Sequence, residues 1–191
     1  MNQMKKINQN KWNDTKASGG EFDKLPAGAY ICVIRSVEDV PDREYLKIEY
    51  DIADGKYKNW WLDTQERAGF WGGTFYRSYK EKALGMFKGF TEAVEKTNDG
   101  YKWDWNEQAL KGKYIGLILN YEQFLNKDNE CKERIYVKSV VNARDIRAGK
   151  YNDLKLTVKE LKDEDKDKLA DTEQAMEESI YEELLVGEIP F

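Results

Sequence analysis

Residues 44–53, EYLKIEYDIA, decide the fold class of this chain. Apolar side chains take every second position of the stretch, and charged or polar side chains take most of the positions between them. Such alternation is typical of a strand in an antiparallel sheet that buries one face. The expected buried face consists of Leu46, Ile48, Tyr50 and Ile52. The expected outer face consists of Tyr45, Lys47, Glu49 and Asp51.

Strand signals lie on both sides of this stretch. Upstream, the turn-forming residues 25–28, LPAG, precede the β-branched run 29–35, AYICVIR, which has the length of a strand. Downstream, Asp54 and Gly55 favour a tight hairpin, so residues 56–63 are expected to pair back as a third strand. The first part of the chain is therefore predicted to be a three-stranded meander.

A helix and a second hairpin are predicted to follow. Ser78 and Glu81 have the spacing of a capping box, and residues 98–100, NDG, are expected to end the helix. Strands are expected at 113–124 and 131–142, with a turn between them. The apolar stripe of the helix consists of Ala83, Phe87, Phe90 and Val94.

The element order strand, strand, strand, helix, strand, strand is that of an OB-fold barrel. Another small β-barrel or an α+β roll shares this order, and the order alone does not separate them. We expect a mainly β protein: a five-stranded OB-fold barrel with one helix between strands 3 and 4, then a disordered acidic C-terminal tail. The expected division is a flexible arm at 1–21, the OB-fold domain at 22–152 and the acidic tail at 153–191.

Composition argues against several classes of protein. The chain has no His and only two Cys, Cys32 and Cys131, so it lacks the ligands of a usual zinc site and the pairs of a disulfide framework. The glycine cluster at 69–73 lacks the Lys-Ser/Thr pair of a phosphate loop. No signal peptide or membrane span is evident. We expect a soluble cytoplasmic protein without cofactor, metal or catalytic activity.

Charge is divided unevenly along the chain, whose net charge is −5. Residues 1–150 carry 26 Lys and Arg against 23 Asp and Glu, whereas residues 151–191 carry 5 against 13. Such an acidic block is typical of a solvating tail, or of an interaction tail that competes with an acidic ligand for the body. The apolar end, Ile189, Pro190 and Phe191, favours the second interpretation, because such a tip suits a partner's pocket.

Aromatic and basic residues alternate in the middle of the chain. Between residues 57 and 79, 8 of 23 residues are aromatic, with Lys and Arg among and beside them. Rings stack on bases and cations hold the phosphate backbone, so this mixture is typical of single-strand binding without sequence preference. Core packing is the competing interpretation for each ring; adjacent Trp60 and Trp61, for example, would point to opposite faces of the expected strand.

The last predicted strand repeats the mixture. Arg134, Tyr136 and Lys138 are expected on one face, opposite the apolar residues Ile135, Val137 and Val141. Together the two regions supply the candidate nucleic-acid contacts: Lys56, Lys58, Trp60, Trp71, Tyr76, Arg77, Arg134, Tyr136 and Lys138.

Three passages resemble the single-stranded DNA-binding proteins of bacteriophages that infect Gram-positive bacteria. The resemblance covers roughly residues 22–152 and the last few residues, and it leaves the N-terminal arm unmatched. The passages are 25–51, from LPAGAY to LKIEYD; 110–147, with LKGK, RIYVKS and RDIR; and the acidic tail that ends in IPF.

This resemblance implies an OB-fold that coats single-stranded DNA without chemistry, while Ile189, Pro190 and Phe191 recruit replication and recombination proteins. The body is less basic than the family's pattern, so stacking is expected to contribute more than charge. A strand-annealing recombinase, which needs more helix, and a protein-binding module, such as a phage inhibitor of a host enzyme, are the alternatives. A homo-oligomer is compatible with the sequence.

Overall fold

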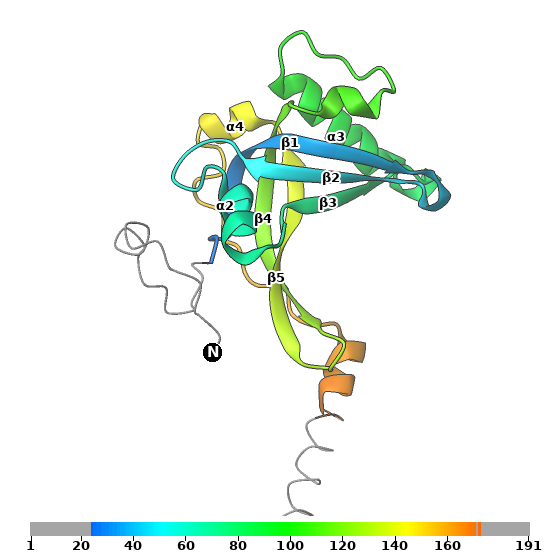
Figure 1. Ribbon diagram of the computed structural model, residues 1–191, viewed down its shortest axis with the longest axis vertical. Helices are drawn as coiled ribbons and strands as arrows, with labels where there is room; N and C mark the ends of the chain where they lie inside the picture. The colour runs from blue at the N-terminus through cyan, green and yellow to red at the C-terminus, as the bar shows by residue number, and fades with distance from the viewer. Residues whose placement is uncertain (1–23, 171, 173–191) are drawn as a thin grey trace, which may run out of the picture.

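The protein is mainly β, as predicted, and is built on one five-stranded antiparallel sheet. The computed structural model describes residues 24–170 and 172 (Figure 1). The strands are β1 (Gly28–Val40), β2 (Tyr45–Ile52), β3 (Thr74–Ser78), β4 (Tyr114–Leu125) and β5 (Cys131–Val141). The helices are α2 (Trp60–Ala68), α3 (Leu84–Thr97) and α4 (Ala143–Arg147), with short 3-10 turns at Pro41–Arg43, Glu81–Ala83 and Glu107–Leu110.

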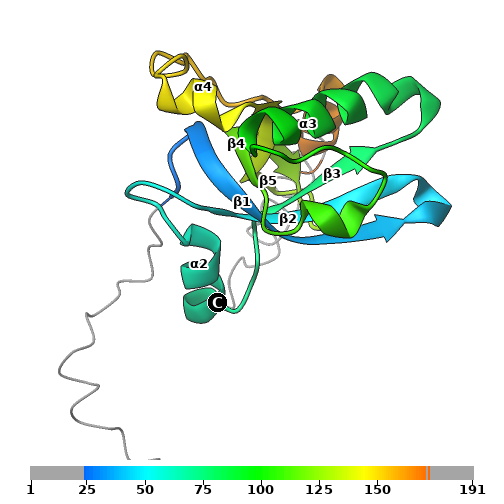
Figure 2. The same ribbon diagram turned by 90° about the horizontal axis from the view of Figure 1, so that it is seen from above.

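The sheet is strongly bent but open. Its strand order is β3-β2-β1-β4-β5, and the first three strands run across the direction of β4 and β5 (Figures 1 and 2). Within residues 24–170 no ladder joins β3 to β5, so both strands have one free edge. The predicted closure of the sheet into a barrel is therefore not confirmed.

The stretch that decides the fold class forms β2, and its expected core face is confirmed. Leu46, Ile48, Tyr50 and Ile52 are all buried in the main core. The expected outer face is wrong at one position, because Asp51 is also fully buried. Helix α2 covers that end of the strand, and the Asp51 carboxylate lies beneath the start of the helix.

Helix α2 replaces the strand predicted at 56–63, and the third strand is instead β3. The physical reason is the Asp51 carboxylate, which accepts hydrogen bonds from the backbone N–H groups of Trp61 (3.0 Å) and Leu62 (3.3 Å). These donors have no partner inside the helix, so the carboxylate stabilises its first turn. Trp60 and Trp61 are consequently helical neighbours, and only Trp61 is fully in the core.

Helix α3 is the predicted helix between strands 3 and 4, and Phe87, Phe90 and Val94 are buried as expected. Its predicted start is wrong. Ser78 ends β3, and its hydroxyl accepts a hydrogen bond from the Lys80 N–H (3.2 Å) instead of capping the helix. Glu81 begins the short 3-10 turn that precedes α3, so the capping box does not form.

The chain beyond the predicted domain end at 152 continues to pack on the sheet. Lys159 forms a parallel bridge with Glu122 of β4, and Leu161 is buried. Residues 163–170 are helical and lie near the end of the β4–β5 hairpin, which projects from the rest of the sheet (Figure 1). The predicted disorder therefore does not begin at 153. The arm predicted at 1–21 and the tip residues Ile189, Pro190 and Phe191 lie outside the described residues.

None of the helices in the described part of the chain is long and apolar enough to cross a membrane.

Candidate nucleic-acid interface

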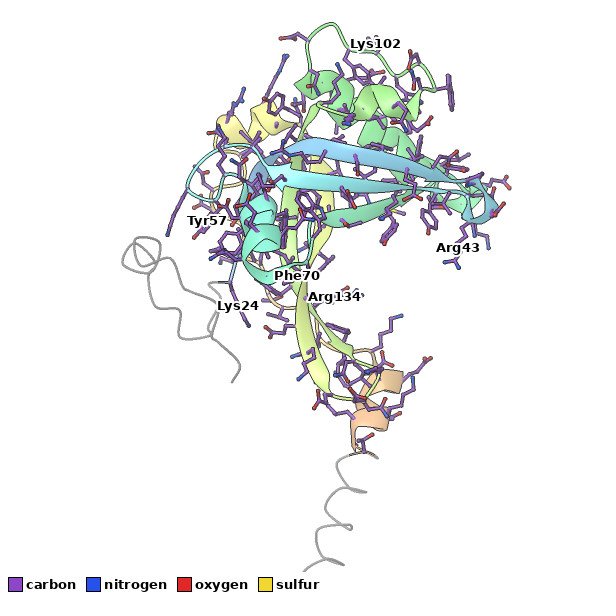
Figure 3. All side chains as sticks on the ribbon, viewed as in Figure 1. Lys24, Arg43, Tyr57, Phe70, Lys102 and Arg134 are labelled. Carbon is purple, nitrogen blue, oxygen red and sulfur yellow. The ribbon has the colours of Figure 1, made fainter. Side chains whose placement is uncertain are left out.

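A groove of about 710 Å³ lies where the sheet is open. Its walls are β3, β5 and helix α2, together with the loop that joins α2 to β3. Five of the nine predicted contacts line it: Trp60, Tyr76, Arg77, Arg134 and Tyr136. The fold thus brings residues 60–77 and 134–136, which are far apart in the sequence, to one surface. Figure 3 shows Phe70, Arg134 and Lys24 close together on this side of the sheet.

Aromatic side chains are presented at the rim of the groove. Phe70 is 56% exposed and Tyr76 is 55% exposed, which is unusual for large rings. Tyr76 is steadied by an edge-on contact with Tyr45, whose ring centroid is 5.3 Å away. Trp60 makes a similar contact with Tyr57 at 5.6 Å. These rings are held in place while parts of their surfaces remain open to a ligand.

Arg77 is the most desolvated cation of the groove. Its guanidinium lies 4.9 Å from the ring centroid of Phe75 and donates a hydrogen bond to the Tyr76 carbonyl (3.0 Å). Burial lowers the pKa of Arg77 to about 10, so the group is still charged at neutral pH. It forms no ion pair with any described residue, which leaves its charge available to an anion.

Arg134 differs from Arg77 because it has an acidic partner. Its guanidinium nitrogen lies 2.8 Å from Glu122 Oε1, and Lys159 Nζ lies 3.1 Å from the other oxygen of the same carboxylate. Burial raises the pKa of Glu122, but the hydrogen bonds from Lys159 and Arg134 outweigh this effect and lower it. A phosphate at Arg134 therefore has to compete with an ionised carboxylate.

Lys24 and Tyr121 belong to the groove and were not predicted. Lys24 Nζ lies 3.0 Å from Glu133 Oε2 and 5.8 Å from the ring centroid of Tyr121. The Tyr121 hydroxyl donates to the Leu25 carbonyl (2.7 Å), which fixes the chain at the groove wall. No local sequence pattern indicates that Lys24 lies beside β5, whereas Tyr121 belongs to the strand that was predicted to pair with β5.

Phe70 and Arg67 were also missing from the predicted contacts, although both lie in the aromatic and basic region. Arg67 belongs to the last turn of α2, and Phe70 follows that helix. A Cβ on Gly72 or Gly73 would overlap the Trp61 ring, so this loop is pressed against α2. The glycine pair beside the aromatic cluster was the signal that could have indicated a tightly packed loop here.

The other four predicted contacts lie elsewhere. Lys56 and Lys58 line a smaller adjoining depression of about 470 Å³, which shares Trp60 and Arg67 with the groove. Trp71 is partly buried against the core, and its indole N–H donates to the Gly73 carbonyl (3.0 Å). Lys138 is exposed but lines neither depression.

The position of Lys138 results from an irregularity in the β4–β5 ladder. Val137 pairs with Leu119 and Ser139 with Ile118, so Lys138 is an extra residue without a partner in the ladder. Beyond it, the side-chain alternation changes phase. Ile135 and Val137 pack against the core as predicted, but Val140 does so in place of Val141.

In the described part of the chain, no group of three or more His, Cys, Asp or Glu side chains is placed to hold a metal ion. Cys32 is buried and Cys131 is exposed, and neither forms a disulfide. Burial raises the pKa of the Cys32 thiol, so this sulfur is not a ready nucleophile.

Comparison of the chain with models of known protein families and with curated proteins found no match.

Proposed function

We propose that this protein binds single-stranded DNA without sequence preference, in the groove between β3 and β5, and protects the strand during phage DNA replication and recombination. The observation that carries the proposal is the combination of exposed rings with Arg77 in one groove. Exposed rings stack on bases of any sequence, and a desolvated guanidinium binds phosphate strongly.

The strand pairing supports the same function. β1 pairs with both β2 and β4, β4 and β5 form a hairpin, and α3 lies between β3 and β4. Such connectivity is compatible with an OB-fold, whose partly open barrel binds oligonucleotides on the face of strands 2 and 3 and on the loops between strands 1 and 2 and between strands 4 and 5. As part of the proposal we assign the sheet to this class, with the open side as the binding surface.

The C-terminal tip completes the proposal. Ile189, Pro190 and Phe191 recruit replication or recombination proteins, as the resemblance to phage single-stranded DNA-binding proteins implies. Its test is capture of partners from host lysate by the full chain and by a chain that lacks these three residues. Loss of specific partners supports the role, and identical partners contradict it.

The binding proposal is tested with two exposed tyrosines. Tyr76 lines the groove and is 55% exposed, whereas Tyr114 is 47% exposed and lies outside it. Tyr76→Ala is expected to weaken binding of a dT oligomer by about 1–3 kcal/mol, the contribution of one stacked base. Tyr114→Ala is expected to leave binding unchanged.

The measurement is the change in Trp fluorescence as the oligomer is added, repeated with duplex DNA of the same length. Preference for the single strand, together with a loss confined to the Tyr76 variant, supports the proposal. Equal affinity for duplex and single strand contradicts it. Absence of binding at low salt favours a protein-binding module, which the exposed apolar side chains outside the groove, Leu84, Met86 and Trp105, would suit.

A further inference from the structure

Residues 157–161 form a strap that covers a free edge of β4. β1 pairs with β4 only as far as Leu119, and the strap takes the same edge farther along. The Lys159 N–H donates to the Tyr121 carbonyl (2.9 Å), and the Gln123 N–H donates to the Lys159 carbonyl (2.8 Å). An unpaired strand edge is thereby satisfied by backbone hydrogen bonds.

The strap is also anchored at both ends. The side-chain amide of Asn120, itself buried, donates to the Thr157 carbonyl (2.9 Å). At the other end, the Leu161 side chain is buried. None of these anchors uses the Lys159 side chain, so the strap holds this residue in place through the backbone and its neighbours.

The Lys159 side chain points toward two residues of the proposed interface. Its Nζ lies 5.5 Å from the ring centroid of Tyr136 and shares the Glu122 carboxylate with Arg134. Two cations therefore surround one carboxylate, and the cluster keeps one net positive charge beside the ring. Lys159 and Arg134 are 55% and 60% exposed, so solvent and ligands reach both.

We propose that Lys159 is a phosphate contact of the nucleic-acid interface, held by the strap beside Tyr136 and Arg134. A base that stacks on Tyr136 brings its phosphate next to both cations, and Glu122 keeps them in position when no ligand is present. This inference rests on the proposed function and adds a segment that was predicted to be part of the acidic tail.

The charge along the chain changes where the strap ends. Residues 153–162 carry three Lys and two acids, whereas residues 163–191 carry two Lys and eleven acids. Residues 153–162, which include the strap, are thus the last part of the chain with a positive net charge. The acidic segment that follows would repel a nucleic acid.

The test compares Lys159→Gln with Lys155→Gln in the full chain. Both variants remove one exposed lysine from residues 153–162, but Lys155 lies outside the strap and does not line the groove. The probe is a fluorescein-labelled dT oligomer of about 16 nucleotides, near the upper site size of one OB-fold. Fluorescence anisotropy is measured over a range of salt concentrations.

One phosphate contact on a single strand contributes about 0.7 to the salt slope, which corresponds to about fivefold in affinity near 0.1 M salt. Lys159→Gln is expected to lose this part of the salt slope and this part of the affinity. Lys159→Arg is expected to retain them, and Lys155→Gln is expected to leave the slope unchanged. Equal slopes for the Lys159→Gln and Lys155→Gln variants would overturn the inference.

Glu122→Gln tests the same cluster of charges, but here the affinity is expected to rise instead of fall. Removing the carboxylate charge frees Arg134 and Lys159, so binding is expected to become tighter and more dependent on salt. Weaker binding by a Glu122→Gln protein that unfolds like the unchanged chain contradicts the inference. If this variant does not fold, the Lys159 comparison decides alone. If the full chain fails to bind the oligomer, the proposed function is refuted. If the full chain binds and Lys159→Gln changes neither the affinity nor the salt slope, only this inference is refuted.

Discussion

At the scale of single residues, Arg77 combines two properties that rarely occur together. It is half-buried, which lowers its pKa to about 10, and no described acid compensates its charge. The guanidinium has therefore lost part of its hydration before a ligand arrives. An incoming phosphate gains a strong hydrogen-bonded ion pair, and little further desolvation of the arginine is needed.

Arg77→Gln is accordingly expected to weaken binding of single strands of every sequence and to lower the salt slope by about 0.7. The control is Arg147→Gln, because Arg147 is an exposed arginine of α4 that lies outside the groove. The free energy of unfolding is expected to change little in the Arg77 variant, since Arg77 is only half-buried and forms no ion pair with a described residue. Anisotropy titrations and urea unfolding check both points, and an unchanged slope places Arg77 off the ligand path.

Asp51 has a structural role at the same scale. Its fully buried carboxylate accepts from the N–H groups of Ile52, Trp61 and Leu62 and lies 3.6 Å from the Arg35 guanidinium. Asp51→Ala is expected to lower the free energy of unfolding by about 3 kcal/mol, because buried N–H groups lose their acceptor.

Urea unfolding measures this loss. Asp63→Ala, which removes an exposed acid from the first turn of the same helix, is the control and is expected to change little. Equal losses in the two variants would show that Asp51 does not stabilise the start of α2.

At the scale of elements, most strands and α3 could be predicted from the sequence, because their apolar residues repeat with the period of the element that forms. Alternation located β2, and the helical spacing of Phe87, Phe90 and Val94 located α3. Helix α2 could not be predicted in this way. Its start depends on Asp51, and its packing depends on Gly72 and Gly73, which are contacts made only in the folded chain.

The packing of this loop leads to a prediction about two glycines. A Cβ on Gly73 would overlap the Tyr50 carbonyl and the Trp61 ring, whereas one on Gly89 of α3 meets nothing within 4 Å. Gly73→Ala is expected to destabilise the protein, while Gly89→Ala is expected to stabilise it by about 1 kcal/mol through helix propensity. Thermal unfolding of both variants measures the signs, and a Gly73 variant as stable as the unchanged chain contradicts the packing.

The candidate site was partly predictable from the sequence, because some of its features are local in the chain. The ring-rich region around Trp60 and Tyr76 is a local feature of the sequence, and so is the pairing of Arg134 with Tyr136. Their meeting across the open side of the sheet is not local. Lys24 precedes the first strand, and Lys159 comes from a segment that composition assigned to the tail, so only their packing brings them close to β5.

At the scale of the whole molecule, the acidic segment 163–191 is expected to compete with a nucleic acid for the basic surface of the rest of the chain. A chain that ends at Lys162 keeps the buried Leu161 but loses eleven acids and two Lys. This chain is expected to bind single-stranded DNA more tightly than the full chain, because a tethered acidic segment competes for the basic surface at high local concentration.

The difference should be largest at low salt and should disappear as screening increases. Anisotropy titrations of both chains at several salt concentrations measure it. Equal affinities at low salt would mean that residues 163–191 do not compete with the ligand.

The gap between β3 and β5 would also determine how the proposed ligand, a polymer, reaches the groove. A tunnel or a closed ring of strands accepts a polymer only through one of its ends, because the polymer has to be threaded. An open groove accepts the polymer from the side, at any point along the polymer. We therefore expect the protein to coat a covalently closed single-stranded circle as fast as a linear strand of the same length, and stopped-flow Trp fluorescence with the two substrates measures the rates. Equal rates would mean that binding can begin at any point along a strand, and slower binding to the circle would contradict sideways entry.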